Sequence, residues 1–190
     1  SEYLMADNLV LRGQTLSFVG DPFEAGPDAA VEHHSDGAVW MEGGLIRAVG
    51  AAKEVLKTAA GATVVNYGNH LITAGFVDCH AHYPQLPIIA SYGEHLLGWL
   101  EKYTFPTESR FHDPELARAA ADLFLEECLR NGITTSSVYA TVHSSSVDAF
   151  FEAAQSRGLR MACGKVLMDR NAPDDLRDTA ESGYEQSKAL

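Results

Sequence analysis

The chain has 190 residues, of which 46% are hydrophobic and 21% are charged. This composition is typical of folded globular proteins and unlike that of disordered chains, so we expect one domain, or one domain with part of a second. A formal net charge of −12 disfavours nucleic acid as a partner, because its phosphates would be repelled. No apolar run approaches the roughly 18 residues of a membrane span, and the first residues carry acids rather than a basic leader. We therefore expect a cytoplasmic protein with no membrane partner.

The first 72 residues have the pattern of β-structure. Two alternating apolar runs flank Gly43 and Gly44, and such a glycine pair is typical of a hairpin turn. The segment 20–37 is rich in Gly, Pro, Asp and His, which predicts a loop. Within that loop, His33 and His34 are expected to be solvated rather than to bind a metal.

From about Thr73 the pattern changes to alternating strands and helices. A strand is predicted at AGFVDCHAH and a short amphipathic helix at EHLLGWLEKY, and Asp113-Pro114 supplies the start of a helix that runs to Arg130. The segments that follow are a strand at ITTSSVY, a helix over 146–157 and a strand at LRMACGKVLM. Short connections between such elements are typical of parallel βα units.

Asp78, His80 and His82 alternate along the first strand of this region. Side chains two residues apart on a strand project from the same face, so we expect all three to point the same way. Two neutral imidazoles on one strand form a rigid half-site for zinc, with Zn–N distances of about 2.0–2.1 Å, and a carboxylate on that face could orient a ligand from behind. The alternative is a pair of half-buried histidines bonded to backbone carbonyls. The preceding apolar strand and the polar loop that follows favour metal ligation.

The segment LITAGFVDCHAHYPQ resembles the signature of the amidohydrolase superfamily, in which a β-sandwich flanks a metal-bearing (β/α)8 TIM-type barrel. Three further segments resemble the guanine deaminases within it, namely YGEHLLGWLEKYTFPTE, VDAFFEAAQSRGLRMACGKVLMDRNAP and DTAESGYEQSKAL. The resemblance departs at Ala74, where the family usually has proline, and in the loop 20–37. It implies an α/β fold in which residues 1–72 belong to the composite β-sandwich domain. Residues 73–190 then hold the first βα units of a barrel that is incomplete in this chain.

The same resemblance implies hydrolytic deamination of guanine to xanthine and ammonia by an enzyme with one Zn²⁺ per subunit. His80 and His82 match ligands of the family, and a zinc ion activates water by lowering its pKa towards about 7. The residues that the family places beside the purine match His82, Tyr83, Pro84 and Gln85, and the Gln85 amide offers both a donor and an acceptor. The general acid/base glutamate and the remaining ligands are expected beyond Leu190. The family also suggests a homodimer.

Other residues of the barrel region allow two interpretations each. Trp99 could wall the purine pocket by stacking, as the family suggests, or pack in the core. His143 follows the second predicted barrel strand, where a capping or loop role is favoured over a place in the site. Asp169 and Arg170 follow the third strand, where they either face substrate or form an ion pair with each other.

Two alternatives to guanine deamination stay open. The first is another amidohydrolase reaction, on cytosine, an adenosine derivative or a chloro-triazine. Independently of the substrate, the native metal could be iron rather than zinc. The second is a non-catalytic scaffold that keeps the fold and has lost its ligands. The intact set of Asp78, His80 and His82 favours an enzyme.

Overall fold

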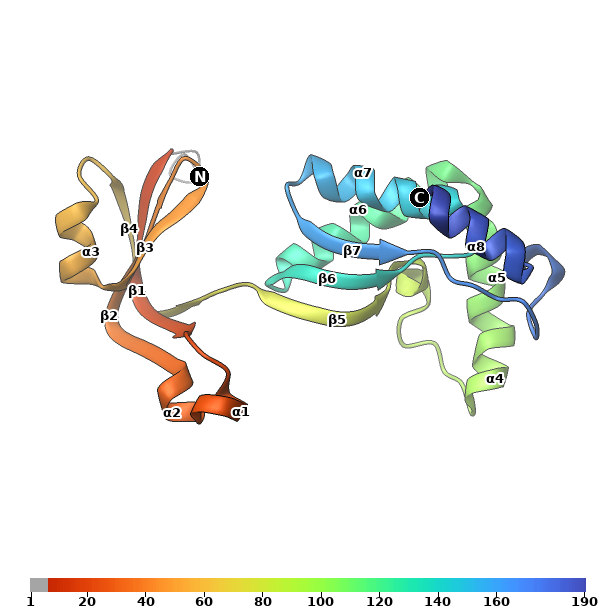
Figure 1. The fold of residues 1–190 in the computed structure, drawn as a ribbon, viewed down its shortest axis with the longest axis horizontal. Helices are drawn as coiled ribbons and strands as arrows, with labels where there is room; N and C mark the ends of the chain where they lie inside the picture. Colours follow the sequence, from red (N-terminus) through yellow and green to blue (C-terminus); the bar gives the residue numbers. More distant parts are fainter. Residues whose placement is uncertain (1–6) are drawn as a thin grey trace. The chain divides into compact units, whose positions relative to one another are not determined.

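The computed structural model describes residues 7–190 and shows mixed α and β structure (Figure 1). The chain divides into two compact units between Ala74 and Gly75, and each unit has its own buried apolar cluster. Within the described residues, every helix is too short or too polar to cross a bilayer.

The first unit is a four-stranded sheet in the order β3-β2-β1-β4. Its strands are β1 (Asn8–Phe18), β2 (Val31–Glu42), β3 (Leu45–Ala51) and β4 (Thr63–Thr73). The pairs β1–β2 and β2–β3 are antiparallel, whereas β1–β4 is parallel. The helix α3 (Ala52–Thr58) packs on the sheet, where Val55 joins Val10 and Ala38 in a core. Gly43 and Gly44, with φ of 61° and 74°, turn β2 into β3, which confirms the predicted hairpin.

The predicted loop over 20–37 is wrong for much of its length. Two short helices, α1 (Pro22–Ala25) and α2 (Pro27–Ala30), are followed directly by β2. His33 and His34 therefore lie on a strand, opposite Leu16 and Thr15 of β1. Pairing with a long neighbouring strand outweighs the local preference of Gly, Asp and His for turns, because strand formation depends strongly on tertiary context.

The second unit contains a parallel sheet in the order β5-β6-β7, which confirms the predicted parallel βα arrangement. Its strands are β5 (Phe76–His82), β6 (Ile133–Tyr139) and β7 (Arg160–Gly164). The helices α6 (Pro114–Arg130) and α7 (Ser144–Ser156) pack against each other and against the sheet (Figure 1). Ser136, Val138 and Ala140 are buried, whereas Tyr139 between them is exposed. The helices thus cover one face of the sheet and leave the other face open.

Local capping signals locate the helices of this unit well. The Asp113 carboxylate accepts the Glu115 N–H at 2.9 Å and Pro114 takes the first turn of α6, as predicted. Thr179 forms a capping box with Ser182 at the start of α8 (Ala180–Ala189). A short helix, η5 (Asp174–Leu176), precedes it.

The predicted short helix around residues 94–103 is longer than expected. After η2 (Tyr83–Ile88), a helical run comprises α4 (Leu96–Trp99), η3 (Leu100–Thr104), α5 (Phe105–Glu108) and η4 (Ser109–His112). The middle piece, η3, has π-helical hydrogen bonding, and such π segments inside helices are frequent at functional sites. This run connects β5 to α6 and includes Trp99.

Gly75 lies directly before β5 at a position with no room for a side chain, because a Cβ there would overlap the side chain of Thr134. We expect Gly75→Ala to lower the free energy of unfolding of the complete protein by about 1–3 kcal/mol, as overpacked sites do. Gly20→Ala is the matched control, since the nearest atom to a Cβ there is 3.8 Å away and its φ is not positive. Denaturant unfolding of both variants measures the difference, and equal stabilities would contradict the close approach.

Candidate metal site

A β-bulge in β5 decides which face each side chain takes. Asp78 pairs with Ser136 and Ala81 pairs with Val138, so the register shifts between them. Since Ser136 and Val138 are buried on the helix-covered face, Asp78 and Ala81 share that face. The expectation that Asp78 points the same way as the two histidines is therefore wrong, because an extra residue in the strand reverses the alternation.

The Asp78 carboxylate contacts the histidine segment through the backbone instead. Its Oδ1 accepts the His80 N–H at 3.1 Å, which holds the bulge. Burial raises the pKa of the Cys128 thiol of α6, and the nearby charge of Asp78 raises it further. Any influence of Asp78 on a ligand is thus exerted through the position of the His80 backbone.

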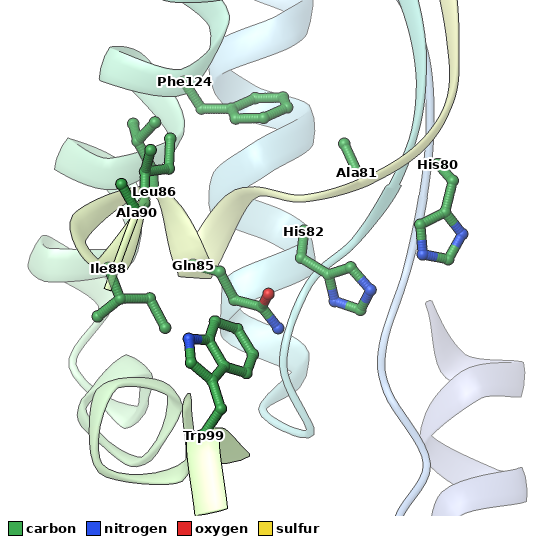
Figure 2. Close-up of a pocket in the computed structure, with 10 residues that line it drawn as sticks. His80, Ala81, His82, Gln85, Leu86, Ile88, Ala90, Trp99 and Phe124 are labelled. Atoms are coloured by element: carbon green, nitrogen blue, oxygen red, sulfur yellow. The ribbon is translucent and has the colours of Figure 1, made fainter. Parts of the chain in front are cut away.

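His80 and His82 lie together on the open face of the sheet. Their ring centroids are 5.2 Å apart, and the Tyr139 ring of β6 stacks on His82 at 4.9 Å. Figure 2 shows the two imidazoles side by side, at the end of β5. The Nδ1 atom of His82 is buried and has no hydrogen-bond partner among the described residues. A buried polar atom without a partner is rare unless something binds it.

The electrostatics of the pair suit a metal ligand. Burial lowers the pKa of His82, and the neighbouring His80 lowers it further. The imidazole is thus kept in its neutral form, which is the form that ligates metals. Within residues 7–190 no cluster brings three or more His, Cys, Asp or Glu side chains to one metal position. The described part of the chain therefore offers a two-histidine half-site.

A cavity of about 330 Å³ adjoins the two histidines (Figure 2), within the size range of small-molecule pockets. Its lining residues are His80, Ala81, His82, Gln85, Leu86, Ile88, Ile89, Ala90, Trp99 and Phe124. Trp99, for which the sequence left pocket and core roles open, lies in this lining, and its indole N–H donates to the Ser91 carbonyl oxygen at 3.2 Å. The wall is mostly apolar, with a few polar groups at one side.

The loop that carries part of this wall has an unusual backbone. Ala90 has a φ of 62°, a left-handed conformation that residues other than glycine rarely adopt. The loop is held on both sides of Ala90, because the Ser91 N–H donates to the Ile88 carbonyl oxygen and the Ser91 carbonyl oxygen accepts from Trp99. The strained alanine is therefore fixed by its neighbours.

Tyr83 and Pro84 do not line the pocket, which contradicts their expected contact with a substrate. Both side chains are completely buried, and Tyr83 packs against Phe111 and Phe150 with centroid distances of 5.6 and 5.3 Å. Its hydroxyl donates to the Ser146 carbonyl oxygen of α7 at 2.7 Å. The strand ends at His82 and η2 begins at Tyr83, so the chain turns and directs these side chains into the core.

Gln85 lines the pocket and has a buried partner that the sequence analysis missed. Its Nε2 donates to Oε1 of Glu108 at 3.0 Å, and Glu108 is only 4% exposed. Burial raises the pKa of Glu108, whereas the hydrogen bond from Gln85 lowers it. The only local signal was an acid in an otherwise apolar and small-residue segment, FPTE, and this signal alone does not indicate which side chain it meets.

The remaining candidates lie apart from this pocket lining. His143 is the residue that precedes α7, and its carbonyl oxygen accepts the Ser146 N–H at 3.0 Å. Its side chain makes no capping hydrogen bond, and its Nε2 is buried without a partner among residues 7–190. Its ring lies 6.2 Å from that of His112. Asp169 and Arg170 form the ion pair that was one of their two interpretations, at 3.0 Å. On the first unit, His34 contacts Glu32 at 2.7 Å.

The chain is similar to known proteins over most of its length. The model of the amidohydrolase family matches residues 71–190. Guanine deaminase of Escherichia coli K12 is 58% identical over 127 residues, which are 67% of this chain and 29% of that protein. A probable guanine deaminase of Deinococcus radiodurans is 36% identical and covers 95% of this chain and 42% of its own length. The solved structure of the E. coli enzyme has a TM-score of 0.88 at 44% identity, over 96% of this chain and 43% of that one. The chain thus spans less than half the length of these relatives.

Because Tyr83 is buried away from the pocket, we expect its hydroxyl to contribute to the stability of the protein and not to its kinetics. Tyr83→Phe removes the hydroxyl that donates to Ser146, and we expect the free energy of unfolding to fall by about 1 kcal/mol, the usual net value of such a bond. The steady-state kinetics of the complete protein should change by less than about twofold. A large rise in KM with unchanged stability would return Tyr83 to the pocket.

Proposed function

Because the chain belongs to the amidohydrolase family, we propose that it carries two metal ligands and part of the purine pocket of a zinc-dependent guanine deaminase. The proposed reaction is hydrolysis of guanine to xanthine and ammonia. One observation carries the proposal: a single cavity is lined by two imidazoles, one of which has a buried nitrogen without a partner among the described residues, and by an amide and an indole that suit a flat, polar heterocycle. The sequence relatives with guanine deaminase activity in their names support it.

In the proposed architecture, the sheet β5-β6-β7 forms the first strands of a (β/α)8 barrel, and the four-stranded unit contributes to a β-sandwich domain. Parallel barrels place their chemistry at the carboxyl ends of the strands, and His82 is the last residue of β5. The open face of the sheet that carries His80 and His82 would then face the barrel interior.

His80 and His82 would hold the zinc ion through imidazole nitrogens. Zinc, when bound, supplies Lewis-acid activation of water and of the carbon that bears the amino group. The stacked Tyr139 ring and the Asp78 contact to the His80 backbone keep the two rings in place before a metal arrives. Such preorganisation lowers the entropic penalty of metal binding.

Gln85 and Trp99 would bind the purine. The Trp99 indole is fixed by its bond to Ser91 and presents an aromatic surface for stacking. The Gln85 amide provides hydrogen-bonding atoms for the purine edge. The described pocket lining contains no carboxylate, so the proton-transfer group would come from another part of the enzyme.

The direct test uses the complete, zinc-loaded protein with guanine. Xanthine and ammonia should form in equal amounts, and adenine and cytosine should react at least tenfold more slowly. Turnover of another heterocycle in preference to guanine would refute guanine as the substrate and would not affect the assignment to the amidohydrolase family.

Loss of either histidine should remove the metal. We expect His80→Ala and His82→Ala each to lose most of the bound zinc and nearly all guanine turnover, because a site of three or four ligands rarely survives the loss of one. His33→Ala is the control, since that side chain is exposed on β2 and, within residues 7–190, has a single hydrogen bond, to Gln14 at 3.3 Å. Full zinc content in the His80→Ala, His82→Ala double variant, measured by elemental analysis, would refute the ligand assignment.

Replacement of Gln85 should weaken guanine recognition and leave the metal in place. An unpaired buried polar group costs about 1–3 kcal/mol, so Gln85→Leu should lower kcat/KM for guanine by roughly tenfold to a hundredfold. Zinc content and melting temperature are measured on the same sample to separate recognition from folding. Unchanged guanine kinetics in the metal-loaded variant would exclude contact with the purine.

A further inference from the structure

Glu108 is a buried carboxylate that the proposed reaction does not use directly. It ends α5, which packs against η2, the short helix that carries Gln85. Its Oε1 accepts the Gln85 amide N–H at 3.0 Å. It is 4% exposed, and no cation forms a salt bridge with it among residues 7–190. Among the described residues, the Glu108 side chain therefore has one hydrogen-bonding partner, and that partner is Gln85, which lines the pocket.

This contact gives the Gln85 amide a direction. An ionised carboxylate has only acceptor atoms, whereas a carboxamide has a donor end and an acceptor end. In the structure the Nε2 of Gln85 faces Glu108, so the Oε1 of Gln85 is the atom left for the pocket. A hydrogen bond to a charged acceptor is roughly twice as strong as a neutral one, so a substrate cannot easily turn the amide round.

Stability alone does not account for a carboxylate at this position. Burial of a charge without a cation is unfavourable, and the rise in the pKa of Glu108 has burial as its main cause. A neutral glutamine at position 108 would fill the same volume and could accept the same N–H without that penalty. What the carboxylate adds is the orientation of Gln85.

We infer that Glu108 is a positioning residue that holds the Gln85 carbonyl oxygen toward the pocket, so that the site selects heterocycles presenting N–H donors to it. This inference rests on the proposed function. Guanine carries such donors at its ring N1 and its exocyclic amine. 2-Aminopurine keeps the amine but presents N1 as an acceptor, which the fixed Gln85 oxygen disfavours.

The test is a double-variant cycle on the complete, zinc-loaded protein with Glu108→Gln and Gln85→Leu. Glu108→Gln should reduce the ratio of kcat/KM for guanine to that for 2-aminopurine by about fivefold, because the amide can then turn. Its zinc content should be unchanged and its melting temperature should be equal or higher. If Glu108 had only a structural role, selectivity would not fall without a loss of stability. In the Gln85→Leu background, Glu108→Gln should leave the ratio unchanged within about twofold. An unchanged ratio in Glu108→Gln alone, or an equal fall in both backgrounds, would overturn the inference.

A thermal arm of the same cycle tests the pairing without any substrate. Gln85→Leu leaves the Glu108 carboxylate without its partner and should lower the melting temperature, and Glu108→Gln in the same chain should restore part of the loss. If the change in melting temperature of the double variant equals the sum of the changes in the two single variants, the two side chains are not coupled and the inference is overturned. A wild-type protein that does not turn over guanine would instead refute the proposed function, and this result is seen before any variant is compared.

Discussion

The packing of the Tyr83 ring against Phe111 and Phe150, at centroid distances of 5.6 and 5.3 Å, anchors the end of β5 in the core. Tyr83 directly follows His82, and η2 brings Gln85 into the pocket lining two residues later. Because Tyr83 is completely enclosed between α6 and α7 residues, the backbone on either side of it has little freedom. The imidazoles before it and the amide after it are therefore held in the lining of the pocket. The geometry of the site depends on a residue that does not belong to it.

Short-range signals predicted most of the framework. Asp113-Pro114, Gly43-Gly44 and Thr179 each act through backbone atoms within four residues, so their effects can be read from the local sequence. The alternation of strands and helices after Thr73 has the same local origin. The histidine pair was identified for a similar reason, since its spacing of two brings both rings to one face.

The features that the sequence could not predict depend on contacts between distant segments. The bulge that moves Asp78 to the other face is defined by its pairing with Ser136 on β6. The strand character of His33 and His34 comes from β1, and the partner of Gln85 lies on α5, a separate helix. Periodicity contains no information on an extra residue in one strand or on which helix meets a loop. Tyr83 was misplaced for the related reason that alternation stops where η2 starts.

The left-handed Ala90 bears on the dynamics of the pocket wall. A left-handed residue other than glycine is less stable by about 1–2 kcal/mol, and here that strain is balanced by the ties of Ser91 to Ile88 and Trp99. When those two hydrogen bonds break together, the strain at Ala90 is released. Opening of this loop therefore needs less free energy than opening of the same loop with glycine at position 90. Local opening of residues 88–91 thus needs less free energy than opening of the core helices. The amide hydrogens of this loop would exchange with solvent before those of α6, and the opening would release the Trp99 indole from its hydrogen bond to Ser91.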